Sequence, residues 1–548
     1  MAKRHNREYF YMAATGTMRG PDPERPATPS ERQRGFRFSE IVVGKDARHS
    51  DALLRAVAEV MTGTGPGVDG DIPAGFTYLG QFVDHDLTKD ETNVGFNTPV
   101  TDIAQMRSGR SPALDLDSVY GRGPEQDQVF YEHDGLRLKT GKTLKAPPAV
   151  AQQELDGFDL PRLGLLTAEP EDVRLAEIPD RRNDENLAVA QTHLAFIRFH
   201  NQVANLLSAG GTPSKVIFDR TREKVVKHYQ WMLRTDYLPR IVDPAIVEDV
   251  FANGRRVFEV DVLHEATMPL EFSVGAFRIG HSMIRERYEW NAVFNGGPGA
   301  LADGSLMNLF QFSGTSGTLT PGADLDNPRP GQNEHLPTNW VADWTQIYDF
   351  AADGHHELAP ELPFNFARAL DIHLVDPLKA LPLGSFGARG APPADSLERN
   401  LAFRNLVRGR MVGLSSGQSV ADHLMAVGVP GIRKLSAAEI LGAEFDGAPA
   451  AIKDELAAQT PLWFYVLREA ELNGGRLGGV GGRIVAETIH RAMEVSDHSI
   501  VRDPFFRPDL GVGERFHMTD LLLVAYDAAK GELRPLSPNA PRPPAAVA

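Results

Sequence analysis

Apolar residues recur every three or four positions over much of the chain, which is the spacing of amphipathic helices. Short runs of alternating apolar and polar residues also occur, as at Phe258–Val262, and predict a strand there. Strands and helices do not alternate along the sequence as they do in a doubly wound sheet. The pattern therefore predicts a mainly α fold, one large helical domain with long loops and little β structure. The predicted helices are Asp51–Met61, Glu185–Leu207, Arg220–Leu238, Glu271–Arg285, Leu397–Val407, Pro461–Leu472 and Val480–Val495.

The two ends of the chain differ in composition from the part between them. Residues 1–35 are polar and rich in Pro, Gly and Arg, which predicts a flexible N-terminal arm. Residues 533–548 are rich in Pro and Ala and predict a C-terminal tail. Residues 36–532 contain no long linker and no internal repeat, so we expect them to form one domain.

Composition excludes several classes of function. The 548 residues include 57 Lys and Arg against 73 Asp and Glu, a net charge of −16, which argues against nucleic acid or an anionic membrane as the partner. No cysteine occurs, so disulfides, iron–sulfur clusters and thiolate-ligated haem are excluded. No run of about 18 apolar residues predicts a membrane span, and no classical signal peptide is visible. We expect a cytoplasmic or non-classically secreted protein.

Three short motifs resemble known sites but lack the surroundings that those sites need. Gly413–Gly417 fits the G-x-S-x-G serine motif, yet the residues before it have helical periodicity and several arginines where a buried strand is required. Gly141–Thr143 resembles the end of a phosphate-binding loop, but position 136 is Leu where the leading Gly should stand. Asn473–Gly482 is glycine-rich but follows a helix, which favours close packing over dinucleotide binding.

His85 has unusual neighbours for a core histidine. Asp84 and Asp86 flank it, and Gln81 precedes it by four residues, one helical turn. In a helix Gln81 and His85 share a face, whereas Asp86 is rotated by about 100°. Two interpretations are equally supported by this segment, a polar pocket in which His85 exchanges protons or a solvated acidic helix end.

His281 lies among apolar residues, with Arg278 three positions before it. A buried neutral imidazole suits a metal ligand. On this segment alone, a hydrogen-bonded core histidine is the more common reason for such a pattern.

Five sequence motifs lie one after another between Gln81 and Arg410 and so span most of the chain. Together they are similar to those of the animal-type haem peroxidases of the peroxidase–cyclooxygenase superfamily, in a bacterial version. The resemblance implies haem b, H2O2 as a substrate, oxidation of a small donor and a place in the response to oxidative stress. The motifs are QFVDHDLT from Gln81, LDLDSVYG from Leu114, DRRNDEN from Asp180, AFRIGH from Ala276 and NLVRGR from Asn405.

The resemblance implies roles for residues on the distal side of the haem. His85 would move a proton between the peroxide oxygens, and Arg182 would stabilise the leaving hydroxide. Gln81 would bind halide or water. Asp84 and Glu185 match the two carboxylates that can form ester bonds to haem methyl groups, so covalent attachment is permitted.

On the proximal side, His281 matches the histidine that ligates the haem iron. Asn405 matches the asparagine that accepts the hydrogen bond from the ligand's Nδ1–H, which strengthens the ligand. Arg278 and Arg408 are expected to pair with the haem propionates.

The family also binds calcium, and the resemblance places that site at Asp86, Ser111, Ala113, Asp115 and Asp117. The last four fall on alternate residues, which lets hydroxyl, carbonyl and carboxylate oxygens converge on one hard cation. Ala113 would contribute its backbone carbonyl. Without the resemblance, an alternating solvated loop would be the favoured interpretation.

Two positions depart from relatives and narrow the predicted activity. Asn186 stands where chloride-oxidising relatives carry a haem-linked methionine, which disfavours chloride as the donor. Arg278 stands where fatty-acid dioxygenases carry a radical tyrosine, although Tyr288 or another tyrosine could substitute for it. We therefore expect a peroxidase that oxidises a halide, thiocyanate or a phenol.

The alternatives are a fatty-acid dioxygenase of the same superfamily and a non-catalytic haem- and calcium-containing interaction protein. The sequence leaves the oligomeric state open.

Overall fold

Helices dominate the computed structural model, as the periodicity predicts. The model describes residues 11–12, 18–19, 36–43, 48–63, 67–91, 94–100, 102–103, 106–164, 173–261, 266–316, 335–382, 392–393 and 395–539. The α-helices are α2 (Asp51–Thr62), α3 (Gly75–Leu87), α4 (Asp117–Tyr120), α5 (Leu187–Ala209), α6 (Ile217–Met232), α7 (Leu238–Ile241), α8 (Pro244–Asn253), α9 (Leu306–Gln311), α10 (Leu401–Met411), α11 (Gly417–Ala426), α12 (Ala437–Leu441), α13 (Ala450–Ala458), α14 (Leu462–Leu472), α15 (Gly479–Val495) and α16 (Met518–Ala525).

Strands in the described residues are short and pair only two at a time. Four pairs are antiparallel, and the pair of β3 and β7 is parallel. The strands are β1 (Tyr11–Met12), β2 (Met18–Arg19), β3 (Phe38–Ser39), β4 (Asp69–Pro73), β5 (Gly141–Lys142), β6 (Asp156–Asp159), β7 (Met268–Pro269), β8 (Arg287–Tyr288), β9 (Gly304–Ser305) and β10 (Phe366–Arg368), joined as β1–β2, β10–β4, β3–β7, β5–β6 and β8–β9.

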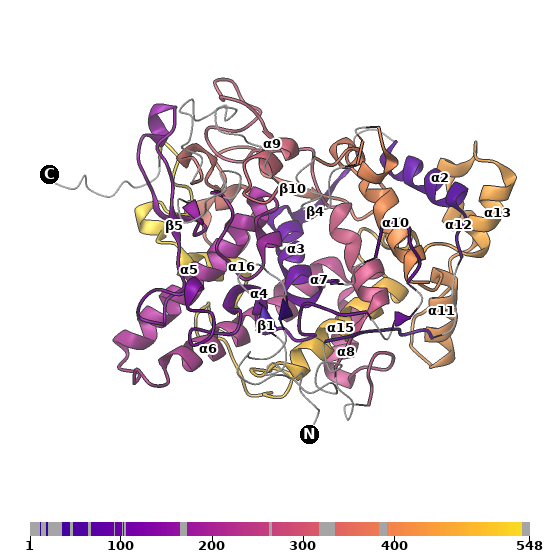
Figure 1. The fold of residues 1–548 in the computed structure, drawn as a ribbon, viewed down its shortest axis with the longest axis horizontal. Coiled ribbons are helices and arrows are strands. Elements are labelled where there is room, and N and C mark those ends of the chain that lie inside the picture. The colour runs from indigo at the N-terminus through magenta and orange to yellow at the C-terminus, as the bar shows by residue number, and fades with distance from the viewer. Residues whose placement is uncertain are drawn as a thin grey trace.

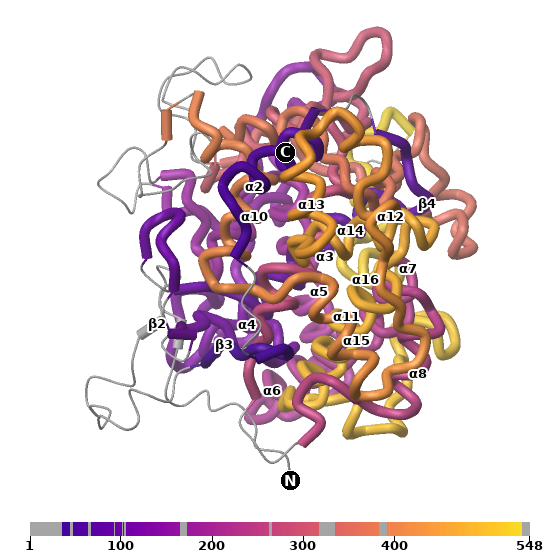
Figure 2. The backbone as a smooth tube through the Cα atoms, turned by 90° about the vertical axis from the view of Figure 1, so that its right-hand side faces the viewer, coloured from indigo at the N-terminus to yellow at the C-terminus, as the bar shows by residue number. Residues whose placement is uncertain are grey.

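Helix α3 lies at the centre of the molecule and packs on α5 (Figure 1). The rings of Phe82 and Phe196 stack between these two helices with their centroids 4.4 Å apart. Helices α6 and α16 pack on α5 in turn, and α2 packs against α10 and α13 on the side that Figure 2 turns toward the viewer. Most of α3 and of the first half of α5 is buried, which fixes the side chains they carry.

The start of α5 shows how the local sequence sets this arrangement. Asn186 caps the helix, because its side-chain oxygen accepts a hydrogen bond from Val189 N at 3.0 Å. Before the cap, the four residues of a short 3₁₀ helix, η7 (Arg181–Asp184), carry the arginine motif. The predicted helix Glu185–Leu207 is thus confirmed, with its start moved to Leu187.

The predicted helix Glu271–Arg285 is wrong as one α-helix. The structure has a π-helical turn, η9 (Glu271–Gly275), followed by a 3₁₀ helix, η10 (Ala276–His281). Gly275 separates them with φ −118° and ψ −94°, outside helical geometry. The predicted helix Arg220–Leu238 likewise changes, because α6 ends at Met232 and continues as a π-helical turn.

The strand predicted at Phe258–Val262 is also absent where the structure describes it, up to Asp261. The backbone N–H groups of Val257 and Phe258 donate to the buried carboxylate of Glu487 at 2.8 and 2.9 Å, so no neighbouring strand satisfies them. Val262 lies outside the described residues.

The structure describes little of the predicted N-terminal arm but several residues of the predicted C-terminal tail. Of the arm at residues 1–35, only the paired strands β1 and β2 are described. The tail predicted at 533–548 begins too early, because Leu533 and Leu536 are buried in the core. Leu533 O accepts a hydrogen bond from Trp344 N at 2.9 Å. None of the described helices has the length and apolar character that crossing a membrane requires.

Candidate active site

One cavity of about 1100 Å³ brings together all nine predicted catalytic and haem-binding residues. They come from four segments that are far apart in the sequence: α3, the arginine motif before α5, η10 and α10. The volume is at the upper end for small-molecule and cofactor sites. The nine residues are Gln81, Asp84, His85, Arg182, Glu185, Arg278, His281, Asn405 and Arg408.

His85 is held in one tautomer by an amide. Its Nδ1 lies 2.8 Å from Asn183 Oδ1, so Nδ1–H donates and Nε2 keeps its lone pair. Asn183 Nδ2 donates in turn to His193 Nδ1 at 2.9 Å, which fixes the amide. Burial, together with the charge of Arg182, lowers the pKa of His85 to about 4. His85 therefore presents a neutral, proton-accepting Nε2.

Arg182 is fixed by a buried carboxylate. Its Nη2 lies 2.7 Å from Asp180 Oδ2 and donates to His85 O at 3.1 Å. Arg110, which is fully buried, pairs with the same carboxylate. Burial alone would raise the pKa of Asp180, but the two guanidinium groups outweigh it and hold that pKa well below its usual range. The cavity thus has a rigid cation beside His85.

A hydrogen-bonded chain of polar side chains continues this wall. Asn186 Nδ2 donates to Gln81 Oε1 at 3.0 Å, and Gln81 Nε2 donates to Glu185 Oε1. Glu185 Oε1 lies 3.7 Å from His85 Nε2. Burial raises the pKa of Glu185 to about 7, although Arg182 opposes the shift. Gln81 and Glu185 therefore lie next to the proton-accepting nitrogen.

His281 ends η10 and lines the same cavity. Burial and the charge of Arg278 lower its pKa to about 3, so the ring is neutral. Asn405 Nδ2 lies 2.8 Å from His281 Nδ1. With the amide turned by 180°, Oδ1 occupies that place, accepts the Nδ1–H and leaves the Nε2 lone pair for a metal. The Trp463 ring packs edge-on against the imidazole, with the two ring centroids 6.2 Å apart.

The two arginines expected at the propionates have carboxylate partners in this structure. Arg278 Nη1 lies 3.6 Å from Asp84 Oδ2, and Arg278 Nε donates to Ser273 O at 2.9 Å. Arg408 pairs with Asp90. Both guanidinium groups line the cavity, so they are placed to receive anionic groups of a bound molecule.

Asp86 lies next to His85 but does not line the cavity. It is fully buried, and its carboxylate accepts hydrogen bonds from Leu116 N and Ser118 N, both at 3.2 Å. Burial and the charge of Asp117 raise the pKa of Asp86 to about 7. A divalent cation would offset that repulsion, so these carboxylates fit the predicted calcium site.

The other predicted calcium ligands converge only in part. Ser111 Oγ donates to Asp117 Oδ2 at 2.6 Å, and Ala113 is buried in the same loop. Asp115 Oδ1 instead accepts from Ser496 Oγ at 2.5 Å. Among the described residues, the carboxylate oxygens of Asp86, Asp115 and Asp117 do not all lie within 4.8 Å of one another. Calcium binding stays a prediction.

Sequence reasoning missed three residues that hold the site in place. Asn183 follows Arg182 directly in the motif, so its position was a usable signal. Asp180 opens the same motif, but its role depends on the pairing with Arg110, which is 70 residues away in the chain. No local pattern in the sequence indicates that pairing.

Comparison with known proteins relates part of this chain to one protein family. Residues 101–300 match the model of the animal haem peroxidase family. The matched segment contains Arg182 and His281, whereas His85 and Asn405 lie outside it. The match therefore covers part of the chain, and part of the cavity.

Curated relatives are similar over a similar share of the chain. A peroxidasin homolog of Caenorhabditis elegans is 30% identical over 199 residues, which are 35% of this chain and 15% of the relative. A peroxidase-like protein of Margaritifera margaritifera is 26% identical over 247 residues, 43% of this chain and 28% of the relative. The alignments thus span less than a third of these relatives' own length.

Solved structures match over nearly the whole chain. Peroxidase A from Dictyostelium discoideum has a TM-score of 0.52 and 17% identity, and the match covers 89% of this chain and 92% of that one. A fatty acid alpha-dioxygenase from Oryza sativa has a TM-score of 0.52 and 12% identity, covering 94% and 85%. At these identities the similarity shows a shared fold, and peroxidases and dioxygenases both have it.

Proposed function

We propose that this protein is a haem-dependent peroxidase that reduces H2O2 and oxidises a small donor, either a halide or thiocyanate ion or a phenol. One observation carries the proposal. A neutral histidine with a free Nε2, His85, lines the same cavity as a fixed cation, Arg182, and a second neutral histidine, His281. The partial match to the animal haem peroxidase family supports an oxidoreductase.

The cavity fits a haem group. His281 would hold the iron through Nε2, and Asn405 would orient the ring. Arg278 and Arg408 line the cavity and would pair with the propionates. Haem iron supplies the electrons and the coordination site that peroxide cleavage needs.

The chain's own residues carry the proton chemistry. His85 Nε2 would accept a proton from the peroxide oxygen that stays and return it to the oxygen that leaves. Because Asn183 binds Nδ1–H, the accepting nitrogen always faces the cavity. Arg182, held by Asp180, would stabilise the negative charge on the leaving oxygen without having to move.

A fatty-acid dioxygenase is the second candidate, because solved structures with this fold include fatty acid alpha-dioxygenases. Arg278 argues against it, since a guanidinium three residues before His281 cannot act as a tyrosyl radical. We expect haem-loaded protein to oxidise guaiacol with H2O2 and to form no product from an unsaturated fatty acid and O2. The opposite result would make the dioxygenase the better account.

Other parts of the proposal come from the sequence resemblance. They are calcium at Asp86, Ser111, Ala113, Asp115 and Asp117, a bacterial origin and a place in the response to oxidative stress. A cytoplasmic or non-classically secreted location is a separate part of the proposal. The partly converged oxygens around Asp86 support the calcium site.

Covalent haem attachment is a further prediction. Asp84 and Glu185 both line the cavity, one beside His85 and the other 3.7 Å from its Nε2. We expect H2O2 treatment to increase the fraction of haem that stays with the protein through acid–organic extraction. The double change Asp84→Asn with Glu185→Gln should return all haem to the extractable pool while the protein stays folded.

Glu398→Gln is the matched control, since Glu398 lines the same cavity but is not one of the two carboxylates that the resemblance matches to the ester bonds. This variant should retain haem as the wild type does. If wild-type haem stays fully extractable after many turnovers, the two carboxylates only line the cavity and the ester assignment is wrong.

A further inference from the structure

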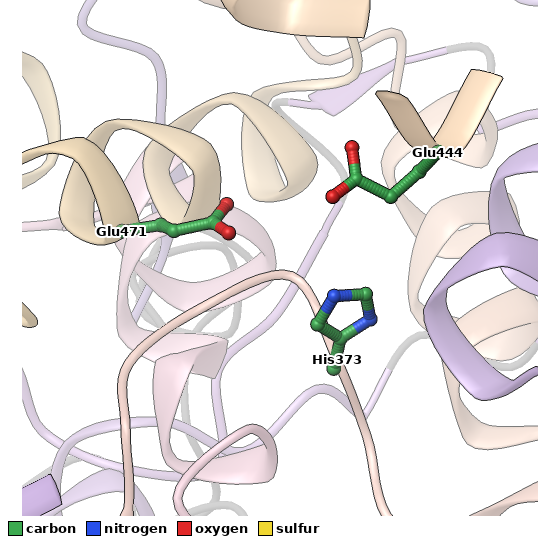
Figure 3. A group of neighbouring side chains, drawn as sticks. All are labelled: His373, Glu444 and Glu471. Carbon is green, nitrogen blue, oxygen red and sulfur yellow. The ribbon is translucent and has the colours of Figure 1, made fainter. Parts of the chain in front are cut away.

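A second group of side chains with metal-ligand chemistry lies away from the cavity (Figure 3). His373 lies in the loop after β10, Glu444 in the 3₁₀ helix η17 (Ala443–Phe445) and Glu471 near the end of α14. The three side chains point toward one another, and one potential ligand atom from each lies within 4.8 Å of the other two. All three are partly exposed, so an ion can reach them from solvent.

Arg468 holds the two carboxylates in place. Its Nη2 lies 2.8 Å from Glu444 Oε2, and its Nη1 lies 2.6 Å from Glu471 Oε2. The Arg468 side chain is only 5% exposed, so its neighbours restrict its movement. The arginine hydrogen-bonds one oxygen of each carboxylate.

The local charge favours a cation. Two glutamates against one arginine leave one net negative charge, and a third carboxylate, Asp371, is close by. Asp371 Oδ1 accepts a hydrogen bond from His373 N at 2.7 Å. A divalent ion bound at the cluster would offset this negative charge.

We propose that His373, Glu444 and Glu471 bind a zinc ion. One imidazole nitrogen with two carboxylate oxygens is a donor set that zinc accepts, whereas calcium and magnesium prefer oxygen ligands throughout. In a tetrahedral zinc site with bonds of about 2.1 Å, ligand atoms lie about 3.4 Å apart. Zinc binding would draw the three ligand atoms, which now lie within 4.8 Å of one another, closer together. Water fills the fourth position.

The ion would act as a structural clamp. Its ligands come from three segments, and α14 also carries Trp463, whose Nε1 donates to Arg278 O at 3.1 Å and whose ring contacts His281. Zinc would therefore tie α14 to the loop after β10 and stiffen the support behind His281. None of these three ligands lines the haem-binding cavity, so zinc binding does not depend on haem.

The test uses the full chain, stripped with a chelator and dialysed against zinc. We expect one zinc per chain at the site, a zinc K-edge absorption spectrum with one imidazole and oxygen ligands, and a higher melting temperature with zinc than without it. His373→Ala and Glu471→Gln should each weaken zinc binding at least about tenfold and abolish the stabilisation. His423→Ala is the control, since His423 is also half-buried but lies on α11, away from the cluster.

The measurements distinguish zinc binding at this site from its absence. Because a zinc edge is distinct from an iron edge, haem content does not affect the readout. If the wild type binds no zinc, or if His373→Ala binds it as tightly as His423→Ala does, the site does not exist. If Glu471→Gln folds and keeps full zinc affinity, Glu471 is not a ligand.

Discussion

Replacing His281 with Ala is expected to abolish stable haem binding. His281 is neutral, lines the cavity and is backed by Asn405, and the chain has no cysteine that could replace it as a ligand. The absorbance of the Soret band per protein, measured after expression with ample haem, should fall to background. His423→Ala, which changes a half-buried histidine outside the cavity, should leave it unchanged.

A folding defect can be told apart from a lost ligand. Circular dichroism should show wild-type helix content for His281→Ala, and added imidazole, which can enter the vacated space, should restore part of the Soret band. Wild-type haem content and an unaltered spectrum in this variant would refute the proximal assignment.

The second large effect is expected at His85. His85→Ala should keep its haem but react with H2O2 more slowly by ~10²–10⁴, the usual loss when a positioned acid–base group is removed. His85→Gln, which keeps a side chain of similar length and places an amide near Asn183, should be similarly slow because an amide cannot exchange the proton. Rapid mixing with H2O2, followed by absorbance, measures both rates.

The control for this experiment is again His423→Ala, which should react at the wild-type rate. An unchanged rate in both His85 variants would remove His85 from the mechanism. It would leave the assignment of His281 intact, because the two histidines lie on separate elements, α3 and η10.

Sequence reasoning succeeded where local pattern and structure coincide. The apolar spacing in Leu462–Leu472 and Gly479–Val495 reflects burial of one face or of the whole helix, so the predicted helices α14 and α15 are confirmed within one residue at each end. The nine cavity residues could be found because the motifs that contain them occur together and in one order along the chain, although no single motif is decisive.

The errors arise where contacts between distant segments decide the structure. Gly275 breaks the helix that the apolar spacing predicts, and the carboxylate of Glu487, 229 residues away, accepts the N–H of Phe258, the first residue of the predicted strand. Leu533 lies in a stretch whose composition predicts a tail, but its carbonyl accepts a hydrogen bond from Trp344 N.

The most direct test of the central claim is an absorption spectrum of the purified, haem-reconstituted protein before and after addition of H2O2. The account predicts a ferric haem spectrum with a Soret band that changes within seconds of H2O2 addition and returns when guaiacol is supplied. A protein that takes up no haem, or a bound haem whose spectrum ignores H2O2, would contradict it.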